Sequence, residues 1–306
     1  MAKAANVVQQ LSTGWFAGAP KYRRSMLTFD HHTHHERCGH ARGTIEEYVE
    51  AALSLGMREI GVTDHAPIYF WDGDHVLPGT AMARSELPRY VDEVLELKRR
   101  YAGRIDVLLG LEVDYAPGFE ELYREVLSAY PFDYLIGSVH FVGDVHIYDQ
   151  RRWREGKPAE EQHREYFRLV RDSARSGLFD VLGHITGILA FGPAPDPALL
   201  EEEFAETARV LAGAGVGIEI NTSAIRKGGS APFPDERLLR RCVDAGVPLT
   251  YGSDSHAPEE VGFARERAAE WLSGAARWRP GAEAAILRRS TVVIEECTQT
   301  STRQLA

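Results

Sequence analysis

The amino-acid sequence predicts an α/β fold in which seven strand–helix units form a single-domain barrel. From residue 26 onward, short apolar strand patterns alternate with longer stretches whose apolar residues recur at helical spacing. The strands are apolar without interruption, which is typical of parallel strands covered on both faces. Polar residues follow nearly every strand, whereas a doubly wound sheet collects its ligands at one switch point. These observations favour a barrel.

The strand and helix patterns can be placed in order along the chain. The predicted strands cover residues 27–30, 59–63, 105–113, 134–139, 180–183, 216–220 and 248–251. The predicted helices cover residues 44–56, 85–101, 119–129, 159–176, 197–213 and 235–245, and a last helix begins near residue 258. Thr44 and Glu47 have the spacing of a capping box at the start of the first helix, which ends at Gly56. Residues 66–84 and 141–158 are longer loops suited to substrate contacts.

The chain divides into three segments. Residues 1–25 show no periodicity and are expected to form an N-terminal extension. Residues 26–275 are expected to form the barrel domain. Residues 276–306 are expected to form a C-terminal segment that packs on the barrel or trails from it.

Composition and charge disfavour several classes of protein. The chain has 306 residues, 44% of them hydrophobic, and no apolar run of the roughly 20 residues that a membrane span needs. The net charge of −10 disfavours a large nucleic-acid surface. The three cysteines show no CxxC spacing, and the first residues lack the apolar core of an export signal. We therefore expect a cytoplasmic protein without disulfides, with no membrane or nucleic-acid partner, whose metal ligands are nitrogen and oxygen.

Nine side chains that can bind metals fall at or just after the ends of predicted strands. They are His32, His34, His40, His65, Glu112, His140, His184, Asp254 and His256. Alternate residues of a strand point to the same face, so His32 and His34 project together while His31 points away. Glu112 stands inside an apolar strand, where an unpaired carboxylate would be costly. A metal ion, or two ions bridged by this carboxylate, would remove that cost.

The nature of these side chains indicates the class of metal. Each position alone has a structural alternative, such as a buried histidine with a satisfied hydrogen bond, but the set recurs at most of the strand ends. Imidazole with carboxylate suits Zn, Fe or Mn. Nine ligands are too many for one tetrahedral ion, so we expect two or three divalent ions. Ions about 3.5–4 Å apart can hold a phosphate group and activate water, as a multi-metal hydrolytic centre requires.

Seven segments of the sequence resemble the polymerase and histidinol phosphatase (PHP) superfamily, and in particular its monofunctional histidinol-phosphatase branch. They are DHHTHHERCGHA at 30–41, TDHAP at 63–67, GLEVDY at 110–115, PFDYLIGSVHF at 131–141, SGLFDVLGH at 176–184, EINTSAIRK at 219–227 and GSDSHAPEEVGF at 252–263. The resemblance covers about residues 26–265. It implies a distorted (β/α)7 barrel of the TIM-like kind, usually with three metals.

The resemblance also implies an activity and roles for individual residues. It implies one metal held by His32, His34, Glu112 and Asp254, a second held by Glu112, His140 and His184, and a third held by His40, His65 and His256. The implied reaction is hydrolysis of L-histidinol phosphate to L-histidinol and phosphate in histidine biosynthesis, by a metal-activated hydroxide. The expected catalytic residues are Glu112, which bridges two metals, and Asp254 and His256, which are candidates for proton transfer.

Several further residues are candidates for substrate contact. Arg226 and Lys227 follow the sixth strand and suit a phosphate dianion, with a solvated surface pair as the alternative. Asn221 can either hydrogen-bond the substrate or cap the end of its strand. Asp30 and Asp64 adjoin ligands, where they either orient them or take part in ordinary hydrogen bonds at the barrel end.

Three other functions remain open. A PHP phosphoesterase could act on another small phosphomonoester or on a nucleotide. An amidohydrolase-type barrel would cleave C–N bonds, but it typically has eight strands and a lysine on the fourth strand, where this chain has His140. A non-catalytic metal-binding barrel is disfavoured by the completeness of the ligand set. The histidinol-phosphatase branch often has a lysine in the segment matching residues 185–190, and this chain has none there. The oligomeric state stays open.

Overall fold

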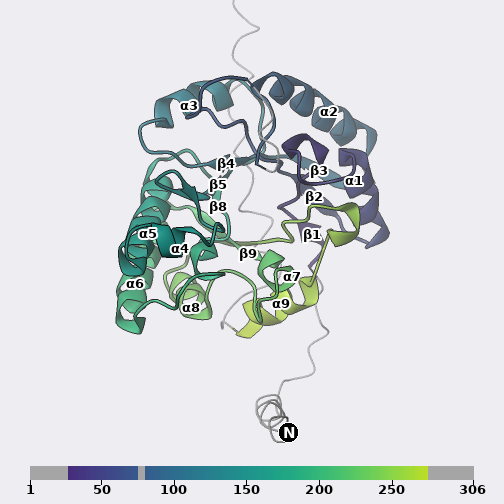
Figure 1. Cartoon of the computed structure of the whole chain (residues 1–306). Coiled ribbons are helices and arrows are strands. Elements are labelled where there is room, and N and C mark those ends of the chain that lie inside the picture. Colours follow the sequence, from purple (N-terminus) through teal and green to yellow (C-terminus); the bar gives the residue numbers. More distant parts are fainter. Residues whose placement is uncertain (1–26, 75–79, 275–306) are drawn as a thin grey trace, which may run out of the picture.

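Parallel β-strands lie at the centre of the computed structural model, and α-helices surround them (Figure 1). The structure describes residues 27–74 and 80–274. One sheet consists of β1 (Phe29–Asp30), β2 (Glu59–Val62) and β3 (Asp106–Leu109), in that order. A second sheet has the order β10 (Leu249–Gly252), β9 (Gly217–Asn221), β8 (Val181–Leu182), β5 (Ile136–Ser138) and β4 (Glu112–Asp114). Every strand pair in these two sheets is parallel, which confirms the predicted α/β class.

The predicted strand over residues 105–113 is divided between the two sheets. Its first part, β3, pairs with β2, and its second part, β4, pairs with β5. The change of partner falls at Gly110, where a Cβ atom would lie 2.6 Å from the Thr63 methyl group and 2.9 Å from the Tyr134 ring. The prediction of one continuous strand was wrong, because the chain changes partner at a point that only glycine fits.

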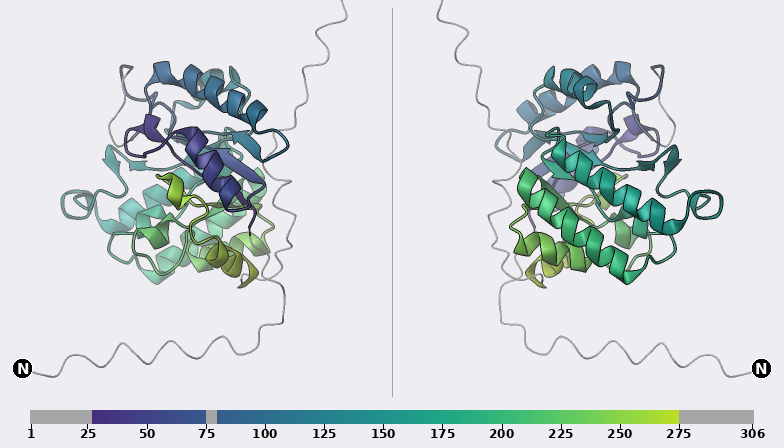
Figure 2. Two further views of the ribbon diagram at one scale, coloured as in Figure 1. Left: turned by 90° about the vertical axis from the view of Figure 1, so that its right-hand side faces the viewer. Right: turned by 90° about the vertical axis from the view of Figure 1, so that its left-hand side faces the viewer.

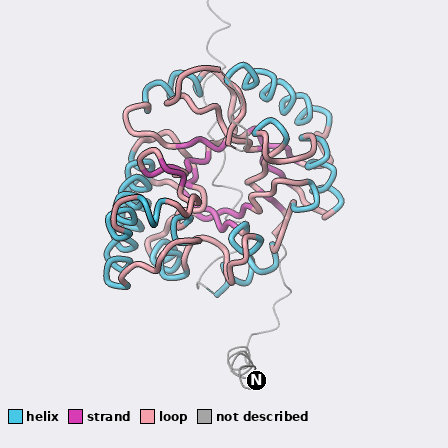
Figure 3. The backbone as a smooth tube through the Cα atoms, viewed as in Figure 1, coloured by secondary structure: helices cyan, strands magenta, loops and turns pink. Residues whose placement is uncertain are grey.

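Hydrogen bonds also join the outer strands β1 and β10. The His31 N–H donates to the Tyr251 carbonyl at 3.0 Å, and the Asp254 N–H donates to the His32 carbonyl at 2.9 Å. Figure 3 shows the strands around the centre of the molecule and the helices outside them. The chain segments that follow β1 and β10 are therefore neighbours, although more than 200 residues separate them.

Six predicted helices lie close to their expected positions. They are α1 (Ile45–Ser54), α2 (Leu87–Arg100), α3 (Glu120–Ser128), α5 (Ala159–Arg175), α6 (Pro197–Ala214) and α8 (Glu236–Asp244). The predicted capping box is present: Thr44 Oγ1 accepts from the Glu47 N–H, and the Glu47 carboxylate accepts from the Thr44 N–H. Helices α5 and α6 pack side by side on one flank of the molecule (Figure 2).

Three stretches differ from the prediction. Residues 141–158, expected to be a loop, contain an antiparallel hairpin of β6 (Phe141–Val142) and β7 (Val145–His146) and the short helix α4 (Arg152–Glu155). Another short helix, α7 (Ser223–Arg226), follows β9. At residue 258 a 3-10 turn (Pro258–Glu260) replaces the expected α-helix, and α9 (Arg265–Gly274) starts later. The delay arises because Gly262 and Ala264 have φ angles of 70° and 52°, which a right-handed helix cannot contain.

Apolar helix faces pack on the strands and form the core. Phe167 on α5 and Phe204 on α6 are fully buried, and their rings meet edge to face with centroids 5.5 Å apart. Burial of a side chain of this size contributes about 1.5–3 kcal/mol to folding. In contrast, the carboxyl ends of the strands hold buried polar side chains, which the apolar core cannot account for.

Of the three predicted segments of the chain, the structure describes residues of the central one only. The segments 1–25 and 276–306 lie outside the described residues. Within residues 27–74 and 80–274, no helix combines the length and apolar character that a bilayer span requires.

Candidate metal centre

Histidine, aspartate and glutamate side chains gather where the parallel strands end. His40 comes from the loop after a 3-10 turn (Glu36–Cys38), and Glu112 opens β4. The other predicted ligands follow strands: His32 and His34 follow β1, His65 follows β2, His140 follows β5, His184 follows β8, and Asp254 and His256 follow β10. Parallel strands present their carboxyl ends at the same edge, so the fold brings these distant residues together.

Glu112 lies in the middle of the group and is 1% exposed. Ring nitrogens of five histidines surround its carboxylate. The distances are 2.8 Å to His65 Nδ1, 3.0 Å to His184 Nε2, 3.5 Å to His32 Nε2, 3.6 Å to His34 Nε2 and 3.7 Å to His140 Nε2. Ser138 Oγ donates a hydrogen bond to Oε1 at 2.6 Å. A carboxylate in this position can bridge two metal ions.

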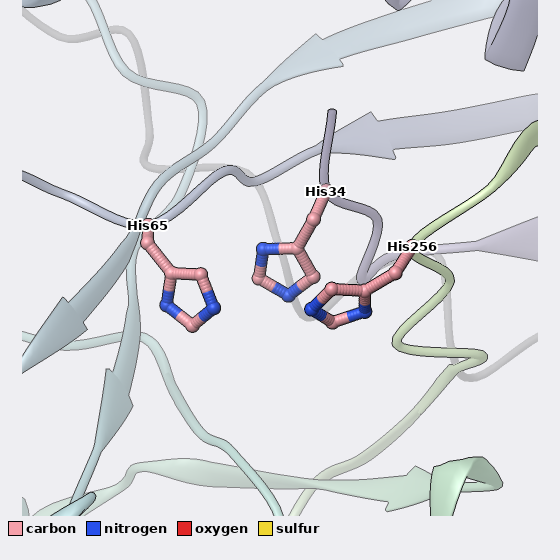
Figure 4. Close-up of side chains that lie close together, drawn as sticks. All are labelled: His34, His65 and His256. Carbon is pink, nitrogen blue, oxygen red and sulfur yellow. The ribbon is translucent and has the colours of Figure 1, made fainter. Parts of the chain in front are cut away.

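Three groups of three residues have ligand atoms within 4.8 Å of one another. The groups are His32, His34 and Asp254; His65, Glu112 and His140; and His34, His65 and His256. Figure 4 shows the third group, in which rings from three chain segments lie beside one another. The two remaining predicted ligands adjoin these groups: His184 Nε2 lies 3.2 Å from His140 Nε2, and His40 Nε2 lies 2.8 Å from His256 Nε2.

The donor atoms of this group fit divalent cations. Among the described residues, His32 Nε2, both ring nitrogens of His34, and Glu112 Oε2 are buried without a hydrogen-bond partner. An unpaired buried polar atom costs about 1–3 kcal/mol, and a cation would pair with the carboxylate oxygen and with the one ring nitrogen of each neutral histidine that has a lone pair. Imidazole nitrogen with carboxylate oxygen suits Zn, Fe or Mn. The residues present therefore fit two or three such ions.

Electrostatic interactions keep the two carboxylates ionised. Burial alone would raise the pKa of Glu112, but nearby histidines, His65 above all, hold it well below its ordinary value. Burial is likewise outweighed at Asp254, where Lys227 and His34 hold the pKa well below its ordinary value. Both side chains are thus ready to bind cations at neutral pH.

The histidines of the group differ in how readily they take up protons. Burial, with the neighbouring His65, lowers the pKa of His40 to about 4. Burial also lowers the pKa of His65 and of His256, so these rings stay neutral, as metal ligation requires. At His140, burial is outweighed by the carboxylate of Asp114, and the pKa rises to about 9. A metal ion must displace that proton, so metal binding competes with protons.

Two of the predicted ligands have a strained backbone. His184 has a φ angle of 29° and Asp254 a φ angle of 53°, in the left-handed region that side chains disfavour. Such a residue costs about 1–3 kcal/mol, and strain of this kind concentrates at functional sites. Hydrogen bonds hold both backbones in place: the His184 N–H donates to Glu219 Oε1 at 2.8 Å, and the Asp254 N–H donates to the His32 carbonyl.

A cavity of 370 Å³ opens above the group, within the size range of small-molecule sites. Seven of the predicted ligands line it: His40, His65, Glu112, His140, His184, Asp254 and His256. Arg226 and Lys227 form part of its wall, together with Asp114, His146 and Tyr148. The cavity therefore combines predicted metal ligands with two cationic side chains.

Comparison with known proteins establishes the family. The family model described as PHP domain matches residues 30–223. The chain belongs to the PHP family. The histidinol-phosphatase of Bacillus subtilis is 32% identical to this PHP domain over 262 residues, which cover 78% of this chain and 96% of the relative. A Deinococcus radiodurans protein named probable histidinol-phosphatase is 38% identical over 238 residues, which cover 76% of this chain and 88% of the relative.

A solved structure has the same fold as this PHP domain. The crystal structure of histidinol phosphate phosphatase from Lactococcus lactis, complexed with zinc, L-histidinol and phosphate, superposes with a TM-score of 0.69 at 25% identity. The match covers 83% of this chain and 95% of the Lactococcus chain. The predicted PHP membership is thus confirmed.

The two cationic residues of the PHP domain lie at the cavity wall in different environments. Lys227 Nζ is 3.9 Å from Asp254 Oδ2 and 4.7 Å from the centre of the Tyr148 ring. Arg226 donates to the carbonyls of Ser253 at 3.2 Å and Asp254 at 2.5 Å. Lys227 is thus close to a predicted ligand carboxylate, while Arg226 also braces the loop that carries this carboxylate.

The other polar candidates contact protein atoms. Asn221 is fully buried, and its Nδ2 donates to Glu219 Oε1 at 2.7 Å and to Asp254 Oδ2 at 3.2 Å. Asp30 accepts from the backbone N–H groups of Ser253 at 2.9 Å and Gly262 at 2.8 Å. Both side chains therefore hold the segment after β10 in position.

Residues beside the ligands orient some of the imidazole rings. Asp114 Oδ1 lies 2.9 Å from His140 Nδ1, whereas Asp64 Oδ1 lies 3.5 Å from His34 Nδ1 and forms no hydrogen bond with it. His31 points away from the group, as strand alternation predicts, and its Nδ1 lies 2.6 Å from Thr250 Oγ1.

Sequence reasoning missed two residues of the site. Glu219 lies in the middle of β9, and its Oε2 is 2.8 Å from His32 Nδ1. A charged residue inside an apolar strand singled out Glu112 and would have singled out Glu219 as well. His146 on β7 stacks on His140 with ring centroids 5.5 Å apart and an interplanar angle of 7°. His146 lies in the segment 141–158 that was expected to contact substrate, and the pair Gly143-Asp144 was the signal for its hairpin.

Proposed function

We propose that this PHP domain is a histidinol-phosphatase, which hydrolyses L-histidinol phosphate to L-histidinol and phosphate in histidine biosynthesis. The observation that carries this proposal is the cavity that joins the nine-ligand group to the cationic wall of Arg226 and Lys227. A phosphate ester needs both features, because its anionic oxygens have to be neutralised during displacement. The names of the Bacillus relative and the Lactococcus complex support the choice of substrate.

The proposal includes where the metal ions bind. One would be held by His32, His34, Glu112 and Asp254, a second by Glu112, His140 and His184, and a third by His40, His65 and His256. Bound divalent ions supply Lewis-acid stabilisation of the phosphoryl oxygens and lower the pKa of water. The position of Glu112 among five imidazoles supports its role as the bridge between two ions.

The wall of the cavity would bind the substrate phosphate. Lys227 presents its ammonium group beside Asp254, at the point where the cationic wall meets the ligand group. The ammonium group would pair with a phosphoryl oxygen, and Arg226 would add a second positive charge. Asn221 would act by holding the Asp254 carboxylate through its Nδ2 atom.

Proton transfer to the leaving alkoxide would involve the segment after β10. His256 and Asp254 both line the cavity, and the His256 Nδ1 atom lies 3.6 Å from Asp254 Oδ1. Because Asp254 is ionised, the proton at this wall would be the one that the neutral His256 ring keeps on Nδ1, 2.9 Å from the Asp254 carbonyl oxygen.

The two parallel sheets would together form one distorted (β/α)7 barrel. The consecutive strands β3 and β4 connect the sheets on one side. The hydrogen bond from the His31 N–H to the Tyr251 carbonyl connects β1 to β10 on the other side. Helices around the strands support this arrangement (Figure 1).

A substrate panel tests the proposed function. The full chain, loaded separately with Zn or Mn, is assayed for phosphate release from L-histidinol phosphate, AMP and p-nitrophenyl phosphate. We expect kcat/KM for L-histidinol phosphate to exceed the others by at least about 100-fold, because polar pockets discriminate strongly between substrates. Comparable values would overturn the specific assignment and favour a phosphoesterase for another small phosphomonoester or nucleotide.

A further inference from the structure

Glu219 is a buried carboxylate that contacts two predicted metal ligands from different strands. It is 1% exposed and lies on β9 between Ile218 and Ile220, which are fully buried. Its Oε2 atom is 2.8 Å from His32 Nδ1. Its Oε1 atom accepts from the His184 N–H at 2.8 Å and from Asn221 Nδ2 at 2.7 Å. One side chain therefore contacts the segments that follow β1 and β8.

The contact with His32 separates the roles of the two ring nitrogens. Nδ1 faces Glu219, whereas Nε2 faces the ligand group, 3.5 Å from Glu112 Oε2. Nε2 is buried and has no hydrogen-bond partner among the described residues. A carboxylate on one ring nitrogen keeps the proton there and leaves the lone pair of the other nitrogen for a metal ion.

Glycines on both neighbouring strands make room for this carboxylate. On β10, a Cβ atom at Gly252 would lie 2.5 Å from His32 Cβ and 2.6 Å from Glu219 Oε2. At the end of β8, a Cβ atom at Gly183 would lie 3.3 Å from Glu219 Oε1. The contact between Glu219 and His32 thus depends on the absence of side chains at flanking positions.

We propose that Glu219 is a positioning residue of the metal centre. Its Oε2 fixes the orientation and the tautomer of His32, and its Oε1 holds the strained backbone of His184. The inference rests on the proposed metal centre. It goes beyond that centre, because it makes the affinity for metal depend partly on a residue that is not one of the predicted ligands.

Glu219→Gln tests this role with little change in shape. An amide offers one acceptor and one donor, so it cannot accept from both the His32 ring and the His184 backbone. Glu203→Gln is the matched control, because Glu203 is also a buried carboxylate, 5% exposed, but it pairs with Arg171 on the outer helices, 2.6 Å away. Each purified full chain is loaded with zinc, and its zinc affinity is measured by competition with a chelating dye.

We expect Glu219→Gln to weaken zinc binding by about 10–100-fold, as is typical when the partner of a ligating histidine is removed. Glu203→Gln is expected to bind zinc within about twofold of wild type, although it loses stability. Equal zinc affinity in the two variants would overturn the role of Glu219. A wild-type chain that binds no zinc would instead overturn the proposed function itself, so the two failures are distinguishable.

A second measurement needs no variant and so does not depend on the folding of Glu219→Gln. The zinc-loaded wild-type chain, labelled with ¹⁵N-histidine, is studied by long-range ¹H–¹⁵N correlation. We expect the His32 ring to carry its proton on Nδ1 and to show the shift of a metal-bound nitrogen at Nε2. The opposite assignment, with the proton on Nε2, would overturn the inference.

Discussion

His184 Nε2 lies 3.0 Å from Oε1 of Glu112, although the two residues are 72 positions apart in the chain. The contact exists because β8 and β4 both pair with β5, which brings the first residue of β4 close to the segment that follows β8. The same carboxylate also reaches His65 on the other sheet, at 2.8 Å. Glu112 therefore connects predicted ligands from both sheets, and its removal should affect every ion that it would bridge.

Glu112→Gln is expected to reduce both the metal content and the turnover of the enzyme. The neutral amide cannot bridge two cations, and its NH₂ group would face imidazole nitrogens. We expect kcat/KM to fall by more than about 100-fold, beyond the effect typical of residues that only orient ligands. Elemental analysis of the purified chain, with Glu203→Gln as the control, measures the metal content. Full activity with unchanged metal would refute the bridging role.

Lys227→Met is expected to weaken phosphate binding without loss of metal. A charge-assisted hydrogen bond contributes about 1.5–3 kcal/mol, so KM and the inhibition constant for inorganic phosphate should both rise by about 10–100-fold. Lys157→Met is the control, because Lys157 is exposed and pairs with Glu161 on α5. Unchanged phosphate inhibition in Lys227→Met would show that this ammonium group does not contact the phosphate.

Gly252→Ala and Gly213→Ala are expected to have opposite effects. At Gly252 the added methyl group would meet His32 Cβ and Glu219, so we expect a loss of about 1–3 kcal/mol in the free energy of unfolding and reduced metal content. At Gly213, inside α6, a Cβ atom would meet nothing within 4 Å, and we expect a gain of about 0.4–1 kcal/mol. Urea unfolding measures the free energy of unfolding of both variants. Equal values for the two variants would contradict the predicted opposite effects.

His163 is expected to make stability depend on pH below neutrality. Burial, with the charge of Arg152, lowers its pKa to about 4, against about 6.5 in the unfolded chain. The contribution of the neutral His163 ring to the free energy of unfolding is therefore fully present above pH 6.5. It is lost as the pH falls toward 4, because in that range only the unfolded chain takes up a proton at this residue. Across this pH range, we expect the free energy of unfolding of wild type to fall by about 2–3 kcal/mol more than that of His163→Phe. Parallel pH profiles for the two proteins, measured by urea unfolding, would disprove this.

The sequence was a good guide wherever one residue or one local pattern determines the structure. The capping box of Thr44 and Glu47 is formed as predicted, because it needs only residues within one helical turn. Strand alternation correctly separated His31 from His32. The nine strand-end residues could be singled out because metal-binding side chains recur at the ends of the predicted strands, and Glu112 also because an unpaired charge is costly in an apolar strand.

The parts that the sequence did not predict depend on contacts between distant residues. The division of β3 from β4 depends on the Tyr134 ring, which lies against Gly110 from the segment just before β5. The hairpin that carries His146 is an exception, because its two-residue turn, Gly143-Asp144, is a local signal that the prediction did not use. A hydrogen bond from Arg152 to the carbonyl of Val145 also holds it. The role of Glu219 depends on its pairing with His32, 187 positions away.

Zinc titration of the metal-free enzyme tests the central claim most directly. The full chain is stripped with a chelator, and phosphate release from L-histidinol phosphate is followed as zinc is added back. We expect no activity in the stripped chain and a rise that levels off at two or three zinc ions per chain, in keeping with the nine predicted ligands. Full activity in the stripped chain, or none after zinc is restored, would contradict a metal-dependent histidinol-phosphatase.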